Sequence, residues 1–155
     1  MKYQSGKKRI LLISSCGGHW VQMNRLTPAF ADHDIYFSST ETEYSELVPE
    51  GHFFPVPDGS RQSNPLLIAR LAFNVLLLLL KVRPHVVLTT GAAPGFFGVL
   101  FGKILGMKTI WVDSIANVDE VSMSGRKAAL FADLYITQWE HLAQSSGPYF
   151  YGSVV

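Results

Sequence analysis

Near the start of the chain a histidine directly follows two glycines, in the run Ser15-Cys16-Gly17-Gly18-His19. Two glycines let a backbone turn sharply and come close to a ligand. A helical pattern begins at once after them, and a helix N-terminus presents unpaired N–H groups and a partial positive charge. We therefore predict an anion site, usually for phosphate, that includes Ser15, Gly17 and Gly18. The alternative is a tight turn that binds no ligand.

His19 is the candidate general base, or the ligand of an acceptor hydroxyl. The start of a helix disfavours a positive imidazolium, and only the neutral ring can accept a proton. The alternative is a helix residue that bonds only to backbone. Cys16 is the single cysteine, and scattered histidines elsewhere are weak evidence for a nucleophile, so we interpret it as a small turn residue. The run lacks the spacing of dinucleotide and P-loop fingerprints, and we predict neither a cofactor nor a metal site.

A second turn of small residues follows another apolar run and leads into a helix. We expect its residues Thr90, Gly91, Ala93 and Gly95 to share substrate binding with the first turn, because both follow buried strands.

Asp113 closes a further strand and is the alternative base, or the group that orients His19. It could equally cap the segment that follows it. Ser114 and Asn117 lie beside it in sequence and are predicted substrate-binding residues. Asn117 and three further residues, Glu120, Arg126 and Gln138, are weaker candidates that could serve a partner interface instead.

The apolar runs predict an α/β fold. Short continuous apolar segments suit strands buried on both faces of a parallel sheet, and helical segments separate them. The order indicates a Rossmann-like, doubly wound parallel sheet, whose ligands lie beyond the carboxyl ends of the strands. We expect strands at residues 10–13, 34–40, 52–56, 85–90, 108–114 and 134–137, and helices at 65–82, 96–105 and 125–131.

Pro65–Val82 is the most apolar segment and is predicted to be a membrane-associating helix. At a hundred degrees per residue its polar residues Arg70, Asn74 and Lys81, with Ser63 before it, fall on one narrow stripe. A helix apolar on nearly all other sides should be covered on more than one side. The predicted membrane contacts are Arg70, Leu76, Leu77, Leu78 and Lys81, with Arg61 and Arg83 as further cations for lipid phosphates. A helix buried between the sheet and a partner chain is the alternative, and a full span is disfavoured because Lys81-Val82-Arg83-Pro84 leads straight into the next strand.

Composition limits the function classes. A chain of 155 residues suits one domain with a real core, spanning 1–155. The formal net charge of +1 gives no case for nucleic-acid binding. Charged residues make up 16% against 48% hydrophobic, which is low for a soluble monomer and favours apolar surface that meets a partner or a membrane. The basic start MKYQSGKKR is followed by an apolar run too short for a signal sequence.

Several motifs in order now point to a family. They are Gly17-Gly18-His19 after the first strand, Thr90–Gly95, Trp111-Val112-Asp113-Ser114, Ser122–Leu142 and the closing Tyr151-Gly152. The chain resembles the membrane-associated subunit of the two-subunit UDP-N-acetylglucosamine transferase of dolichol-linked oligosaccharide synthesis. It also resembles the bacterial PssD-type proteins of capsule and exopolysaccharide synthesis.

The resemblance implies the N-terminal half of a split GT-B glycosyltransferase, with MurG as the single-chain relative. In that arrangement this half docks a lipid-diphosphate-linked sugar acceptor at the cytoplasmic membrane face. A separate protein supplies the half that binds the UDP-sugar, and the length of this chain agrees with that division. Two departures, the absence of an N-terminal spanning helix and Asp113 where the eukaryotic subunit commonly has Glu, favour a bacterial form and leave the transferred sugar open.

Two other functions stay open at this stage. In one, the chain is a non-catalytic recruiter that only holds the partner at the membrane. In the other, it is a soluble small-molecule-binding α/β domain whose apolar helix is an ordinary buried crossover.

Overall fold

The computed structural model describes residues 6–59 and 64–154, and Arg61 and Ser63 of the sequence prediction lie outside them. Seven parallel strands form one sheet in the order β3-β2-β1-β4-β5-β6-β7. The predicted α/β class and parallel doubly wound sheet are confirmed. The strands are β1 Arg9–Ile13, β2 Asp34–Ser39, β3 Phe53–Pro55, β4 Val86–Thr89, β5 Lys108–Val112, β6 Leu134–Thr137 and β7 Tyr149–Phe150.

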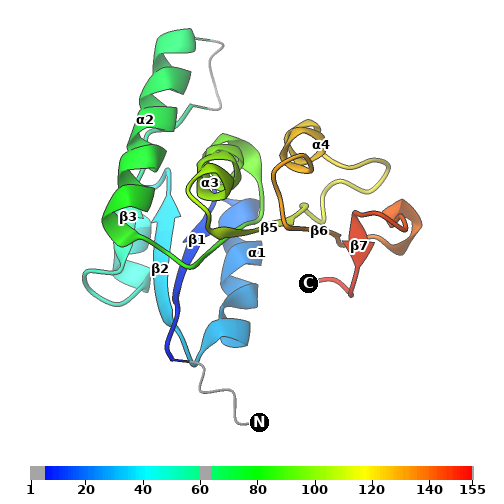
Figure 1. The fold of residues 1–155 in the computed structure, drawn as a ribbon, viewed down its shortest axis with the longest axis horizontal. Helices are drawn as coiled ribbons and strands as arrows, with labels where there is room; N and C mark the ends of the chain where they lie inside the picture. Colours follow the sequence, from blue (N-terminus) through cyan, green and yellow to red (C-terminus); the bar gives the residue numbers. More distant parts are fainter. Residues whose placement is uncertain (1–5, 60–63, 155) are drawn as a thin grey trace.

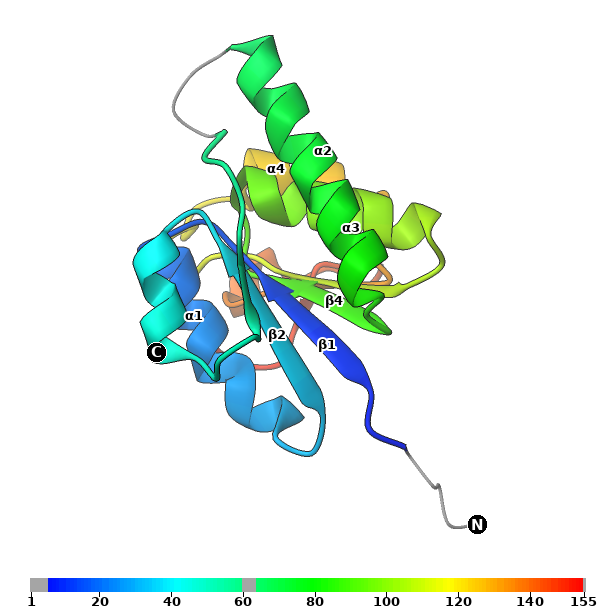
Figure 2. The same cartoon turned by 90° about the vertical axis from the view of Figure 1, so that its left-hand side faces the viewer.

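Helices cover both faces of this sheet. Figure 2 shows α1 on one face and both α2 and α3 on the other. The helices are α1 Gly18–Leu26, α2 Pro65–Val82, α3 Ala92–Ile104 and α4 Met123–Ala128, with short 3-10 turns η1 Thr27–Phe30, η2 Thr42–Leu47 and η3 Glu140–Leu142. β2 and β3 are added on one side of β1, whereas β4 to β7 follow on the other side. The boundary between β1 and β4 is therefore the switch point where open α/β sheets bind ligands.

β1 lies in the centre of the sheet and explains the continuous apolar run. Leu11 and Ile13 face the core under α2 and α3, while Ile10 and Leu12 face the core under α1. Both faces are therefore buried, and an alternating polar pattern could not be accommodated there. This central strand carries the glycine turn directly to the carboxyl edge of the sheet.

α3 approaches the sheet closely because of its glycines. A Cβ added to Gly98 would lie 2.9 Å from Ile13 of β1, and one added to Gly102 would lie 3.1 Å from Thr109 of β5. The helix starts at Ala92, four residues before the predicted Phe96, since Gly91 and Ala92 take positive φ angles of 128° and 65° and turn the chain directly into the helix. The glycine spacing thus fits α3 against the strands.

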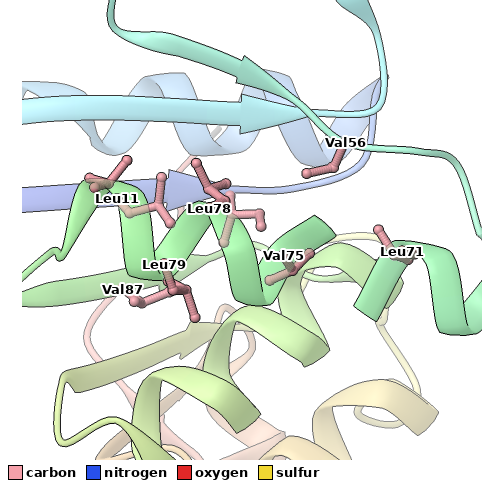
Figure 3. Packing of buried hydrophobic residues seen from close by; sticks show 9 residues of the cluster. Leu11, Val56, Leu71, Val75, Leu78, Leu79 and Val87 are labelled. Atoms are coloured by element: carbon pink, nitrogen blue, oxygen red, sulfur yellow. The ribbon is translucent and has the colours of Figure 1, made fainter. Parts of the chain in front are cut away.

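α2 matches its predicted bounds, Pro65–Val82, but it is buried on one side only. Leu71, Val75, Leu78 and Leu79 pack onto β1, β4 and Val56 (Figure 3). Within the described residues the protein itself covers only that side, and an apolar outer face is exposed: Leu66, Ile68, Phe73, Leu77 and Leu80. The expectation that a membrane or a partner chain covers this outer face stays a prediction. The prediction that Leu78 contacts a membrane is corrected, because Leu78 is only 6% exposed and belongs to the core.

The N-terminal end of α2 projects beyond the other elements in both views (Figures 1 and 2). Since α2 connects β3 to the parallel strand β4, it runs against the strand direction, so this end lies toward the carboxyl edge of the sheet. The exposed apolar end of the helix and the glycine turns therefore lie toward the same edge.

Two further differences from the prediction concern the C-terminal third. β7, a strand of only Tyr149–Phe150, was not predicted. α4 starts at Met123, two residues earlier than expected, because the Ser122 side chain accepts a hydrogen bond from the Gly125 N–H and caps the helix there.

Candidate functional site

The two glycine turns are joined at the switch point by a reciprocal pair of hydrogen bonds. Nδ1 of His19 lies 2.8 Å from the Thr90 carbonyl oxygen, and the Thr90 hydroxyl donates to the His19 carbonyl at 2.6 Å. Gly91 lies beneath the imidazole, where an added Cβ would be 2.9 Å from Cε1 of His19. The expected convergence of the turns on one edge of the sheet is confirmed, and it holds the histidine ring in one orientation.

This contact settles which nitrogen of His19 carries the proton in the neutral ring. A carbonyl oxygen can only accept, so Nδ1 must donate and Nε2 keeps its lone pair. His19 is partly exposed and lines a polar pocket with a volume of about 220 Å³. The other lining residues are Ala92, Ser114, Ala116, Asn117, Ser122, Met123 and Ser124.

The first turn uses two of its N–H groups within the protein. Cys16 N–H donates to the Thr40 hydroxyl at 3.2 Å, and Gly17 N–H donates to the Tyr44 hydroxyl at 3.1 Å. The predicted anion site in this turn is therefore narrowed to the N–H groups at the very start of α1.

The helices differ in whether a side chain caps the N–H groups at their N-terminus. α2 and α4 each have a side-chain N-cap, from Asn64 and Ser122 respectively. α1 and α3 begin at Gly17 and Gly91 without a side-chain cap bond. Since the first N–H groups of a helix have no intrahelical partner, the two helices that meet at the switch point keep donors for a ligand.

The second turn contributes little side-chain surface to the pocket. A Cβ on Gly95 would fall 1.9 Å from the Thr89 hydroxyl oxygen, so packing of α3 on β4 requires glycine there. Ala93 packs against the core cluster under α2. Ala92 adopts a left-handed conformation at φ 65°, which costs about 1–3 kcal/mol for a non-glycine residue and persists only where the surroundings impose it. Ala92 is the residue of this turn that reaches the pocket.

Asp113 is buried, with 1% exposure, and its carboxylate accepts four hydrogen bonds. The donors are the indole N–H of Trp111 at 3.0 Å, the side-chain amide of Asn117 at 3.2 Å, and the backbone N–H and hydroxyl of Ser122 at 2.8 and 2.5 Å. The group at Nδ1 of His19 is the Thr90 carbonyl and not Asp113. This geometry favours the alternative in which Asp113 organises the segment that follows it.

Gly125 and Tyr135 lie against the same carboxylate. A Cβ on Gly125 would be 2.7 Å from both Oδ1 of Asp113 and the Tyr135 hydroxyl, so only glycine fits at this point of α4. Burial raises the pKa of the Tyr135 hydroxyl above its ordinary value, and the negative charge of Asp113 raises it further. Tyr135 therefore stays neutral over the usual working range of pH.

Sequence reasoning missed Gln22, which lies one helical turn beyond His19 on α1. Gln22 is 6% exposed, and its amide joins Ser114, Ile115 and Gln138 in one buried network. The available signal was a pair of polar residues at i and i+3 on a helix that leaves the carboxyl edge. Gln138, a weaker site candidate that could have served a partner interface instead, is buried in this network at 4% exposure.

Other candidates lie apart from the pocket. Cys16 is exposed in the turn, and Glu120 and Arg126 form an exposed ion pair with each other at 2.6 Å. Within residues 6–59 and 64–154, no group of three or more His, Cys, Asp or Glu side chains is arranged to hold a metal ion.

The outer face of α2 combines apolar and basic side chains. Phe73 is 59% exposed and Leu77 47% exposed, and α2 is long and apolar enough to cross a membrane by length and composition. Lys81 lies over the Phe54 ring at 4.8 Å from its centroid, and the exposed Arg83 follows at the C-cap. Arg70 and Leu76, both predicted membrane contacts, are exposed and partly buried respectively.

Comparison with known proteins identifies the family. The model of the family described as "Oligosaccharide biosynthesis protein Alg14 like" matches residues 59–154. The chain belongs to this family. The match includes the second glycine turn, Asp113 and the closing segment, which are stretches on which the resemblance was based, whereas Gly17-Gly18-His19 lies outside it.

Two curated relatives in this Alg14 family are named as UDP-N-acetylglucosamine transferase subunits. The protein of Yarrowia lipolytica is 26% identical over 151 residues, covering 93% of this chain and 66% of the relative. The protein of Candida albicans is 30% identical over 143 residues, covering 88% of this chain and 64% of the relative. The chain thus spans just under two thirds of the length of these relatives.

The fold is also similar to that of part of MurG. The crystal structure of Acinetobacter baumannii MurG superimposes with a TM-score of 0.77 and 13% identity, covering 96% of this chain and 46% of MurG. The predicted relation to MurG-type GT-B glycosyltransferases is confirmed at the level of the fold.

Proposed function

We propose that this chain is the acceptor-binding subunit of a two-component glycosyltransferase. The complex would transfer a sugar from a UDP-sugar to a lipid-diphosphate-linked saccharide in polysaccharide or oligosaccharide synthesis. The observation that carries this proposal is His19, held by Thr90 at the mouth of a polar pocket between two uncapped helix N-termini, in a chain of the Alg14 family.

His19 would act as the general base. Its Nδ1–H is bound to the Thr90 carbonyl, so Nε2 is free to take the proton of the acceptor hydroxyl. That oxygen forms the new bond to the anomeric carbon of the donor sugar. The bond from this carbon to the phosphate oxygen breaks, and UDP leaves with the electron pair. The imidazole of His19 becomes partly positive as it takes the proton, and its hydrogen bond to the Thr90 carbonyl stabilises that charge.

The diphosphate of the acceptor would lie on the N–H groups that begin α1 and α3. Both helices lack side-chain caps, and their dipoles favour an anion at this point. The pocket itself is lined by hydroxyl, amide and methyl groups around His19, which suits the neutral hydroxyls of a sugar. The two surfaces adjoin at Ala92, so one acceptor can reach both.

The outer face of α2 would rest on the cytoplasmic surface of the membrane. Its exposed apolar side chains suit acyl chains, and Arg70, Lys81 and Arg83 suit lipid phosphates. The N-terminal end of α2 lies toward the edge that carries the pocket, so a membrane-bound lipid would present its diphosphate to the two turns. A separate donor-binding subunit would complete the site, which fits the word "subunit" in the names of the relatives.

Reconstitution tests the proposal. The chain is co-expressed with a donor-binding protein encoded beside it, and transfer from UDP-N-acetylglucosamine and other UDP-sugars to a lipid-diphosphate-linked sugar is measured. We expect transfer by the complex and little by either protein alone. Efficient transfer by this chain with nothing added, or complex formation without transfer to any such acceptor, would contradict the proposal.

Vesicle flotation tests the membrane contact separately. The double variant Phe73→Glu, Leu77→Glu should reduce binding to anionic vesicles at least tenfold, because it places two charges on the apolar face. Leu47→Glu, which alters a side chain 70% exposed on η2, is the matched control and should bind normally. If the unmodified chain, the double variant and Leu47→Glu bound the vesicles equally, α2 would be excluded as the membrane contact. A helix face covered by a partner chain would then be favoured.

A further inference from the structure

Gln22 lies on α1 three residues after His19, so both side chains leave the same helix on neighbouring positions of one face. His19 reaches the pocket, whereas Gln22 is buried between α1 and the ends of β5 and β6. A glutamine in this position must satisfy two donors and an acceptor away from water.

Its hydrogen bonds fix the orientation of the amide. Ile115 N–H donates to Oε1 at 3.0 Å, which identifies that atom as the oxygen, and Gln138 Nε2 donates to the same atom at 2.6 Å. The amide nitrogen donates to the Ser114 hydroxyl oxygen at 3.1 Å. These three hydrogen bonds are consistent with only one orientation of the Gln22 amide.

Two of the bonds of Gln22 go to the turn at 114–117, which forms part of the pocket wall. The Ser114 hydroxyl oxygen that accepts from Gln22 also accepts from Ala116 N–H at 3.2 Å, and Asn117 N–H donates to the Ser114 carbonyl at 3.0 Å. Ser114, Ala116 and Asn117 line the same pocket as His19. One helix therefore carries the proposed base and also the amide that holds this part of the pocket wall.

Gln138 extends the network to the end of the described chain. Its Nε2 also donates to the Asp113 carbonyl at 2.9 Å, and its Oε1 accepts from Val154 N–H at 2.9 Å. The position of residue 154 is thus connected through two buried amides to the turn at 114–117.

We propose that Gln22 is a positioning residue that sets the separation between His19 and the wall formed by Ser114–Asn117, and so determines how the acceptor sugar is held. This inference rests on the proposed function for its kinetic consequence, while its structural part stands without it. Gln22 itself does not touch the substrate.

The test compares Gln22→Met with Asn24→Met in the complex. Methionine keeps the volume of glutamine and removes all three hydrogen bonds. Asn24 is an amide on the same helix whose side chain donates to the Trp20 carbonyl of α1 and not to the pocket wall. For Gln22→Met we expect amide exchange of Ile115 and Ala116 to accelerate about tenfold or more, and KM for the acceptor to rise about tenfold with KM for the UDP-sugar unchanged. Asn24→Met should show neither change.

Gln22→Glu supplies the second arm. Its first oxygen still accepts from Ile115 N–H, and the Ser114 hydroxyl can rotate to donate to the second oxygen. Exchange at Ile115 and Ala116 should therefore remain much closer to the wild type than in Gln22→Met. The positioning role would be overturned if amide exchange at Ile115 and Ala116 were unchanged in Gln22→Met. It would also be overturned if Gln22→Glu and Asn24→Met accelerated this exchange as much as Gln22→Met does. Accelerated exchange together with a wild-type complex that transfers no sugar would instead leave the positioning role standing and refute the proposed function.

Discussion

His19 and Asp113 lie at the same edge of the sheet, and both were predicted from sequence as catalytic. They differ in how much of their hydrogen-bonding capacity the protein already uses. Nδ1 of His19 donates to the Thr90 carbonyl, and Nε2 keeps its lone pair beside the pocket. Asp113 accepts four hydrogen bonds and is 1% exposed, so no lone pair direction is left for a substrate.

This contrast separates a group that can react from one that shapes its surroundings. A base must reach the proton that it removes, and a buried, saturated carboxylate does not. Asp113 instead connects β5 to Asn117 and Ser122, and both of these side chains line the pocket. A catalytic role for either residue stays a prediction, but the geometry favours His19 as base and Asp113 as support.

The largest expected effect is that of His19→Ala. Loss of a general base lowers the transfer rate by about 100- to 10,000-fold, while the melting temperature and binding to the donor-binding subunit should stay near those of the wild type. Steady-state transfer by the complex measures the rate, calorimetry measures the melting temperature, and co-purification measures binding to the donor-binding subunit.

His52→Ala is the matched control, since this histidine precedes β3 at the opposite edge of the sheet and bonds the Glu50 carbonyl. Full activity in His19→Ala would remove the base from the mechanism and favour a chain that only recruits its partner to the membrane.

Most of the fold could be predicted because its signals are local. The apolar run Ile10–Ile13 is continuous since both sides of β1 are buried, and the glycine turns follow directly from the ends of β1 and β4. β7 escaped prediction because two residues carry no periodicity. In α2, apolar residues occur nearly all round the helix, so the pattern could not show that Leu78 faces the core and Leu77 faces outward.

The candidate site was only partly predictable, for a different reason. His19 was found because a glycine turn and a helix start are visible in sequence. The partners of polar groups come from distant segments: Thr40 and Tyr44 occupy the N–H groups of the first turn, and Gln22 meets Ser114 across 92 positions. A glutamine inside a helix has nothing in its own neighbourhood that distinguishes a buried network from an exposed surface.

Asp113→Ala tests whether the Asp113 carboxylate supports the structure around the pocket. It leaves the Trp111 indole N–H and the Ser122 N–H buried without acceptors, at about 1–3 kcal/mol each, so we expect a loss of about 3 kcal/mol in the free energy of unfolding. For a chain of this length that corresponds to a melting temperature lower by roughly 10 °C. Urea unfolding and calorimetry measure it.

Asp119→Ala removes an exposed carboxylate from the same loop and should change stability by less than about 0.5 kcal/mol. If Asp113→Ala instead unfolded like the wild type and lost activity as completely as His19→Ala, the supporting role would be wrong and Asp113 would take part in the chemistry.

Asp133 offers the smallest effect and shows what a more open carboxylate does. Its Oδ1 accepts from Lys103 Nζ at 2.5 Å and its Oδ2 accepts from Thr109 N–H at 2.9 Å. The hydrogen bond from Lys103 lowers the pKa of Asp133 below its ordinary value, and the Thr109 N–H contributes in the same direction. The ion pair therefore adds stability above the unfolded-state pKa of about 3.9, and this contribution is lost as the pH falls through the lower folded-state value.

Asp133→Asn keeps an acceptor for the Thr109 N–H and removes the charge. Because the Asp133 side chain is 25% and that of Lys103 48% exposed, solvent screens the pair, and we expect a loss of only about 0.5–1 kcal/mol at pH 7. Urea unfolding at pH 7 and at about pH 3 should show this difference shrinking toward zero in acid. A difference that stays constant with pH would mean that packing, and not the charge of Asp133, accounts for it. The buried carboxylate of Asp113 should by contrast matter at both pH values, since Asp113→Ala also removes the acceptor atoms.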